Sequence, residues 1–127
     1  MVLYGYAGRI LRINLTKGKI TAFKIDYKLL KMFIGGTGLA ARILWSELKP
    51  GVDPLSPDNK FVIATGLFTG TLVPCSGSVE FCFKSPLTGI WGETRAGGSF
   101  GPKVKFAGYD LVIIEGASRK PVYIYIH

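Results

Sequence analysis

Residues 8–25 read GRILRINLTKGKITAFKI, and this stretch predicts a fold built on a β-sheet. Two runs rich in aliphatic and β-branched residues flank the turn Thr16–Lys19, in which Gly18 can adopt a positive φ. We therefore expect an antiparallel hairpin over Gly8–Lys24, and the rest of the chain is interpreted outward from it.

Two short helices are expected directly after the hairpin. Asp26 can cap the first, because its carboxylate accepts hydrogen bonds from free backbone N–H groups, and Gly35-Gly36 ends it. A second helix is predicted to begin at Thr37 or Gly38 and to end at Pro50-Gly51. Its apolar stripe has helical spacing and consists of Leu39, Ala40, Ile43, Leu44 and Leu48.

Beyond the second helix, short apolar stretches alternate with loops rich in glycine and threonine. The pattern indicates an α+β, β-rich fold class: antiparallel sheets with two or three short helices, in a single domain over residues 1–127. A third short helix is predicted to begin at Pro102. The expected strands are Phe61–Thr65, Val79–Lys84, Gly89–Trp91, Leu111–Glu115 and Val122–Ile126.

The composition fits one globular domain and excludes several protein classes. The 127 residues are 48% hydrophobic and 19% charged, which excludes disorder, and the 17 glycines follow no fixed period, which excludes collagen. No apolar run reaches the roughly 18 residues that span a membrane, and no secretory signal opens the chain. We expect no membrane partner and a cytoplasmic location. The stop at His127, directly after a strand signal, predicts an incomplete domain of a longer protein.

Few residues offer catalytic or metal-binding side chains. The single histidine, His127, is the last residue, which argues against a nucleophile–histidine site and a zinc site. Cys75 and Cys82 are too few for a disulfide framework, so we expect a loop thiol and a strand residue. Glu93, beside the glycine-rich loop described below, is interpreted as a solvated charge.

The formal net charge of +8 indicates an anionic partner: nucleic acid, an acidic protein surface or a phosphorylated cofactor. Aromatic residues make up 13% of the chain and could stack on single-stranded bases. Aromatic and basic residues do not alternate along any predicted strand, so we expect the rings to fill a small core instead. The rings in question are Tyr4, Tyr6, Phe68, Trp91, Phe100 and Phe106.

The loop Thr94–Gly101 is the strongest ligand-binding candidate. Gly97-Gly98 allows a ligand to approach the backbone closely, because no Cβ is in the way. Successive N–H groups in such a turn bind anions, and a helix that begins at Pro102 adds its positive end. Together with Arg95 and nearby lysines the loop suits a phosphate group. A plain tight turn is the alternative.

Five segments, in their order and spacing, resemble the N-terminal domain of the aldehyde ferredoxin oxidoreductase family. The resemblance covers essentially the whole chain. The segments are Tyr4–Thr16, Phe33–Ala40, Asp53–Pro57, Lys84–Gly89 and Lys105–Asp110.

This resemblance implies a fold and a function. Family members are tungsten or molybdenum enzymes, usually of anaerobes, whose metal is held by two pterin dithiolenes. They oxidise aldehydes to carboxylic acids and pass electrons through a [4Fe-4S] cluster to ferredoxin. The N-terminal domain forms part of a β-rich saddle under the bis-pterin cofactor, and the cluster-binding and substrate domains come later.

The chain alone is then expected to be inactive and to hold no cluster ligands. Its expected partners are the remainder of the enzyme, ferredoxin and the aldehyde, and a homo-oligomer is compatible with the resemblance.

The resemblance also assigns the site residues. It places the pterin phosphates against Thr94, Arg95, Ala96, Gly97 and Gly98, with the main-chain carbonyl of Arg95 binding a magnesium ion that bridges the phosphates. Arg95 stands where several members have asparagine, which leaves a carbonyl ligand unchanged.

At a second position the chain departs from the family. Ser78 stands where members often have an arginine between pterin and cluster, and a hydroxyl does not replace a guanidinium. This puts the electron path in question or indicates a divergent branch. Two alternatives stay open: a separately encoded, non-catalytic assembly subunit, and a basic β module for nucleic acid, which the resemblance disfavours.

Overall fold

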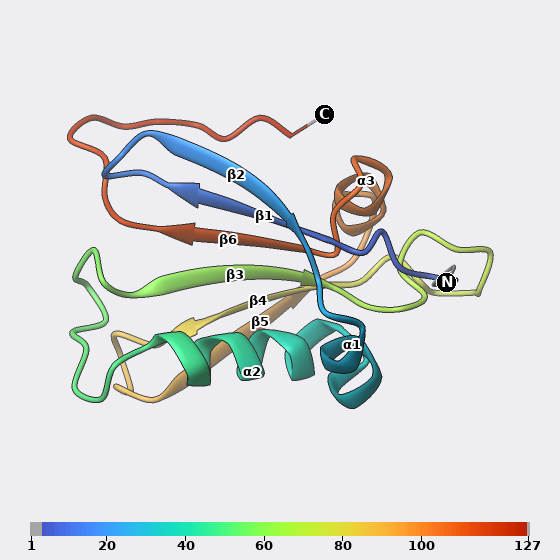
Figure 1. Cartoon of the computed structure of the whole chain (residues 1–127), viewed down its shortest axis with the longest axis horizontal. Coiled ribbons are helices and arrows are strands. Elements are labelled where there is room, and N and C mark those ends of the chain that lie inside the picture. The colour runs from blue at the N-terminus through green and yellow to red at the C-terminus, as the bar shows by residue number, and fades with distance from the viewer. Residues whose placement is uncertain (1–3, 127) are drawn as a thin grey trace.

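The computed structural model describes residues 4–126 and contains one mixed β-sheet (Figure 1). Its strands are ordered β2-β1-β6-β3-β4-β5. The strands are β1 (Arg9–Asn14), β2 (Lys19–Lys24), β3 (Lys60–Thr65), β4 (Val79–Lys84), β5 (Trp91–Ala96) and β6 (Leu111–Glu115). The helices within the described residues are α1 (Tyr27–Phe33), α2 (Gly36–Glu47) and α3 (Phe100–Phe106). The α+β, β-rich fold class is confirmed.

The predicted hairpin forms β1 and β2, with Arg9 opposite Lys24 and Asn14 opposite Lys19. Every other pairing in the sheet is antiparallel except that of β1 with β6, which runs parallel from Ile10↔Leu111 to Asn14↔Glu115. Strand β6 therefore lies in the middle of the sheet and joins β1 to β3.

The helix boundaries follow the capping chemistry. The Asp26 side chain accepts a hydrogen bond from the Lys28 N–H at 2.9 Å, as predicted for the cap of α1. Helix α2 begins at Gly36, one residue before the predicted start, and ends at Glu47. The predicted end at Pro50-Gly51 is wrong, because Leu48 already has an extended backbone with ψ 127°.

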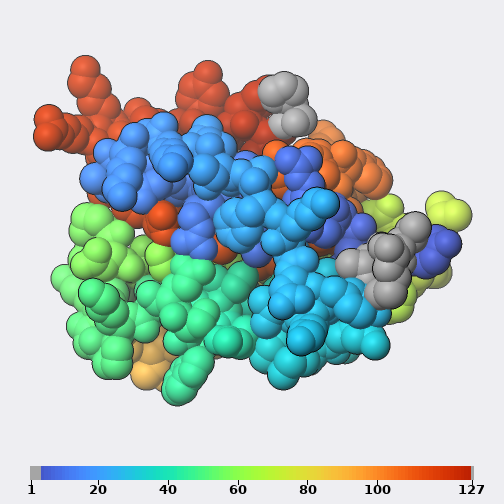
Figure 2. All heavy atoms as spheres, in the orientation of Figure 1, coloured from blue at the N-terminus to red at the C-terminus, as the bar shows by residue number. Residues whose placement is uncertain are grey.

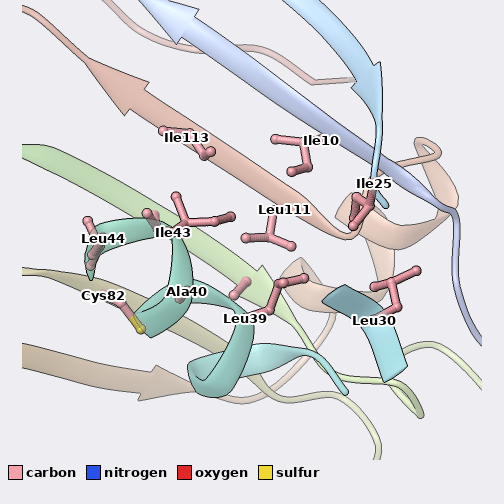
Figure 3. Packing of buried hydrophobic residues seen from close by; sticks show 12 residues of the cluster. Ile10, Ile25, Leu30, Leu39, Ala40, Ile43, Leu44, Cys82, Leu111 and Ile113 are labelled. Atoms are coloured by element: carbon pink, nitrogen blue, oxygen red, sulfur yellow. The ribbon is translucent and has the colours of Figure 1, made fainter. Parts of the chain in front are cut away.

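Helices α1 and α2 cover one face of the sheet (Figures 1 and 2). The predicted apolar stripe of α2 points into this core, where Leu39, Ile43 and Leu44 pack toward Leu111 and Ile113 of β6 (Figure 3). A second core cluster on other residues of the same strands includes Leu11, Ile63, Val79, Val112 and Val104 of α3. Two apolar layers thus hold the sheet between α1–α2 and α3.

Three predictions about the second half of the chain are wrong. The strand predicted at Gly89–Trp91 begins only at Trp91 and continues to Ala96 as β5. Thr94–Ala96 are therefore in a strand, and the predicted loop begins after Ala96. Helix α3 begins at Phe100, and Pro102 occupies its first turn, where no N–H donor is needed. Val122–Ile126 forms no strand: Ile126 packs on the second core cluster, and the other four residues are exposed.

The prediction that the aromatic residues fill the core is also wrong. Tyr4, Phe68, Trp91, Phe100 and Phe106 are exposed, and of the six rings named only Tyr6 packs against a core cluster. The buried side chains of both clusters are aliphatic, together with Cys82.

Between residues 4 and 126, no helix is long and apolar enough to cross a membrane. His127 lies outside the described residues.

Candidate functional site

The β4–β5 pairing brings together the residues that were predicted to bind phosphate. In its register Val79 is opposite Ala96, Glu80 opposite Arg95 and Phe81 opposite Thr94. Ser78 directly precedes β4, so it lies beside the Gly97-Gly98 bend that follows β5. Because β5 is at the edge of the sheet, the main-chain groups on its outer side have no strand partner among residues 4–126.

The Gly97-Gly98 bend is at the surface, with one side open and one side tightly packed. A Cβ built on either glycine would meet no atom within 4 Å, and Gly98 has a φ of +86° that favours glycine. On the packed side, a Cβ on Gly77 would lie 2.6 Å from the carbonyl oxygen of Gly98. The bend is thus packed against Gly77 from behind and is open in front.

Thr69 holds the packed side in place and was not identified from the sequence. Its buried side-chain Oγ1 donates to the Ser78 carbonyl at 2.9 Å and accepts from the Gly66 N–H at 2.9 Å. The sequence feature that could have indicated Thr69 is its place between Gly66 and Gly70, where a small hydroxyl can bridge two chain segments. The Ser78 hydroxyl itself forms no hydrogen bond within residues 4–126, so it can donate to a ligand at the bend.

Arg95 directs its side chain to Glu80, its cross-strand neighbour. The Arg95 Nε donates to Glu80 Oε1 at 2.5 Å, and the Arg95 side chain is 66% exposed. Neither terminal guanidinium nitrogen of Arg95 is bound to another described residue. The guanidinium therefore keeps donors available for an anion while the carboxylate fixes its base.

Glu80 is the second residue that sequence reasoning missed. It is 8% exposed, and its Oε2 atom has no hydrogen-bond partner within the described residues. Its Cγ lies 3.8 Å from where a Cβ on Gly36 would be, so it is beside the first residue of α2. A charged residue among the apolar residues of Val79–Phe83 was the available signal.

Glu93 and the two cysteines lie where the sequence predicts them. Glu93 is exposed and accepts a hydrogen bond from Trp91 Nε1 at 2.9 Å. Cys75 is exposed and Cys82 is buried, both as free thiols. Burial, with the nearby charges of Glu93 and Glu80, raises the pKa of the Cys82 thiol to about 12. Within residues 4–126, no three His, Cys, Asp or Glu side chains gather to hold a metal ion.

Comparison with known proteins decides the family. The profile of the aldehyde ferredoxin oxidoreductase N-terminal domain matches residues 10–127. The chain belongs to this family. The resemblance found in the sequence is therefore confirmed, and the chain represents the N-terminal domain of the family's oxidoreductases.

Relatives of the family extend well beyond this domain. The chain is 48% identical over 124 residues to the tungsten-containing aldehyde ferredoxin oxidoreductase of Pyrococcus furiosus, covering 98% of this chain and 20% of the relative. It is 38% identical over 129 residues to the WOR-like subunit of an aliphatic sulfonate oxidoreductase of the same organism, again covering 98% and 20%. The chain thus spans about a fifth of the length of these relatives.

A solved structure shows the same fold at similar coverage. It is that of the active-site complex BamBC of benzoyl coenzyme A reductase with 1,5-dienoyl-CoA, at 36% identity and a TM-score of 0.95. The superposition covers 97% of this chain and 19% of the other.

Proposed function

We propose that this chain holds the phosphate end of a tungsten or molybdenum bis-pterin cofactor in an aldehyde-oxidising enzyme that passes electrons through a [4Fe-4S] cluster to ferredoxin. The observation that carries the proposal is the exposed Gly97-Gly98 bend at the end of edge strand β5, open in front and fixed from behind. When bound, the metallated cofactor supplies the redox chemistry, and protein supplies binding and orientation.

The residues at the bend fit the phosphate end of such a cofactor. Free N–H groups beside residues without a Cβ let phosphate oxygens come close to the backbone. The Ser78 hydroxyl and the terminal nitrogens of Arg95 add donors from both sides, and charged donors bind phosphate strongly. Main-chain carbonyl oxygens are suitable ligands for a hard cation such as magnesium, and we assign that role to the carbonyl of Arg95.

The names of the relatives support a role in binding what these enzymes share. They are named for aldehydes, for an aliphatic sulfonate and for benzoyl coenzyme A, which are chemically different substrates. The matched region is the same in all three. We therefore assign cofactor binding to this domain and selection of the substrate to the remainder of the enzyme.

We further propose that the chain alone does not turn over aldehydes. It has two cysteines, one of them buried with a raised pKa, and so cannot supply the thiolates of a four-iron cluster. Its first partner is then the remainder of the family enzyme. Aldehyde-dependent reduction of a viologen dye by the 127-residue chain would contradict this part of the proposal.

The test of the phosphate site uses magnesium pyrophosphate as the probe. We expect amide NMR shifts at Ser78, Gly97 and Gly98 on titration, with weaker binding when magnesium is omitted. Gly98→Ala is expected to reduce binding about tenfold, because the alanine strains a positive φ at the bend.

The matched control is Gly18→Ala, which places an alanine at another positive φ (+59°), in the open turn between β1 and β2 at the far side of the sheet. Equal binding by both variants, or shifts confined to other residues, would remove the proposed phosphate site.

A further inference from the structure

An open apolar groove lies between the C-terminal end of α2 and the turn that joins β4 to β5 (Figure 1). Its volume is about 1220 Å³, and it is lined by Trp45 and Leu48 from the helix end and by Ile90 and Trp91 from the turn and the start of β5. Trp45, Ile90 and Trp91 are 87%, 69% and 39% exposed. Large apolar side chains gathered in this way mark a surface that contacts another protein segment.

The charged residues that line the groove are all basic. They are Arg42, Lys49 and Lys84. Lys84 donates to the main-chain carbonyl of Val52, whereas Arg42 and Lys49 form no ion pair or hydrogen bond with another residue between 4 and 126. The groove therefore complements an apolar segment that carries acidic residues on its flanks.

Two acidic side chains on the same elements do not offset this charge. Glu93 on β5 accepts a hydrogen bond from Trp91 Nε1, and it is not part of the lining. Glu47 at the end of α2 pairs with Arg12 and Lys60 instead. A second copy of this chain would bring its own net charge of +8 to the groove, so it is a poor occupant.

The size and shape of the groove favour a polypeptide over a small molecule. Pockets for small molecules enclose most of the ligand and measure roughly 300–1,000 Å³. This groove is larger and leaves Trp45 almost fully exposed. An amphipathic helix laid with its apolar side in a groove is a common mode of recognition. The chain covers only about 20% of its curated relatives, so enzymes of the family contain many segments that could supply such a helix.

We propose that the groove between α2 and the β4–β5 turn binds an acidic amphipathic helix from the remainder of the family enzyme. This rests on one part of the proposed function, namely that the remainder of the enzyme is the first partner of the chain. The groove is at the start of β5, roughly 20 Å along the strand from the Gly97-Gly98 bend at its end. The remainder of the enzyme then holds this end of the sheet and leaves the bend free for phosphate.

The first experiment uses the fluorescence of Trp45 and Trp91, the two tryptophans of the chain, which both line the groove. Two tryptophan-free helical peptides of about 18 residues, or five turns, share one leucine face. Their polar residues are glutamate in one peptide and lysine in the other. We expect the glutamate peptide to shift the emission to shorter wavelengths and to bind about tenfold more tightly than the lysine peptide. Trp45→Ala should weaken its binding about tenfold, because tryptophan at a contact contributes strongly.

Reversing the charge of the groove should reverse the preference. We expect Arg42→Glu combined with Lys49→Glu to bind the lysine peptide more tightly than the glutamate peptide. The matched control is Lys17→Glu combined with Lys19→Glu, which changes the net charge equally at exposed positions of the β1–β2 hairpin and should keep the original preference. Thermal unfolding verifies that both variants are folded. Equal binding of the two peptides, no binding, or the same response of both charge-reversed variants would overturn the proposal.

A second experiment identifies the source of the helix. Hydroxyl-radical footprinting by mass spectrometry compares the chain alone with the family enzyme in which the chain is joined to its remainder. We expect oxidation of Trp45 to fall about tenfold in the assembled enzyme, because the centre of such a contact excludes water. Full reactivity of Trp45 in the assembled enzyme would overturn the proposal. If the preference for the glutamate peptide were intact, that result would assign the groove to a separate acidic protein.

Magnesium pyrophosphate separates this proposal from the phosphate site. Gly98→Ala should weaken binding of magnesium pyrophosphate and leave binding of the glutamate peptide unchanged, and Trp45→Ala should have the opposite effects. Loss of the pyrophosphate response with an intact peptide preference would remove the phosphate site and keep the groove. An intact pyrophosphate response without a peptide preference would remove only the groove.

Discussion

Lys105 Nζ lies 2.7 Å from Asp110 Oδ1, and the two side chains are only 10% and 2% exposed. The Asp110 carboxylate also accepts from the N–H groups of Ala7 at 3.1 Å and Gly8 at 2.6 Å. Its main-chain carbonyl accepts from the N–H and the hydroxyl of Thr65. One residue therefore joins the entry to β1, the end of α3 and the end of β3. Strand β3 leads directly into the loop 66–78, which ends at Ser78 of the proposed site.

Replacing Asp110 should destabilise the whole domain. Asp110→Asn removes the charge that balances the buried Lys105 ammonium, and breaking a buried pair from one side costs about 3–5 kcal/mol. Urea denaturation should show this loss in the free energy of unfolding. Asp58→Asn, at an exposed loop carboxylate, should stay within about 0.5 kcal/mol of the natural chain. Equal stabilities would show that the Lys105–Asp110 pair contributes little.

Glu115 should make stability depend on pH in the acidic range. Burial alone would raise its pKa, but hydrogen bonds from Lys60 and Asn14 and the charges of Lys60 and Arg12 outweigh burial and lower the pKa from 4.5 to about 2. Because the folded pKa is below the unfolded value, the stabilisation is complete above about pH 4.5 and is lost as the pH falls toward about 2. Glu115→Gln should reduce the dependence of the free energy of unfolding on pH between about pH 2 and 4.5, measured by urea denaturation at several pH values. An unchanged slope would contradict the assignment.

The two cysteines should differ sharply in reactivity. Cys75 is exposed, whereas Cys82 is buried and its pKa is raised to about 12, so its thiolate is scarce at neutral pH. A maleimide reagent followed by mass spectrometry should label one thiol in the folded chain and two in denaturant, with Cys75→Ser abolishing the native label. Rapid labelling of Cys82 in the folded chain would contradict the packing of β4 against α2.

Gly77 and Gly97 should respond differently to alanine. A Cβ at Gly77 comes within 2.6 Å of the Gly98 carbonyl oxygen, so the bend must shift, at a cost of about 1–3 kcal/mol. A Cβ at Gly97 meets nothing within 4 Å, and Gly97→Ala should be nearly neutral in thermal unfolding. Equal melting temperatures for the two variants would show that the packed side of the bend is not rigid.

The parts of the fold that could be predicted from the sequence are those decided by neighbouring residues. The turn at Gly18, the cap at Asp26 and the apolar stripe from Leu39 to Leu44 each depend on local spacing, and all three are confirmed. The strand predicted at Val122–Ile126 is wrong, because a run of β-forming residues does not by itself provide a neighbouring strand, and here only Ile126 packs on the core.

The site was predictable only in part, for the same reason. An open bend at Gly97-Gly98 could be predicted because glycine itself indicates one, and the structure shows it open. The pairing of Glu80 with Arg95 depends on the register between β4 and β5, which single residues do not reveal. Thr69 and its bond to the Ser78 carbonyl depend likewise on where a long loop returns.

The central position of β6 has a consequence for how the chain folds. Strand β1 is synthesised early, yet its partner β6 is about a hundred residues later. Strand β3 also pairs with β6, so this pairing forms late as well. The hairpin and the β3–β4–β5 unit are therefore two half-sheets that only the late strand can join. Such long-range closure slows folding, and it makes assembly of the domain an all-or-none event that comes after nearly all of these residues have left the ribosome.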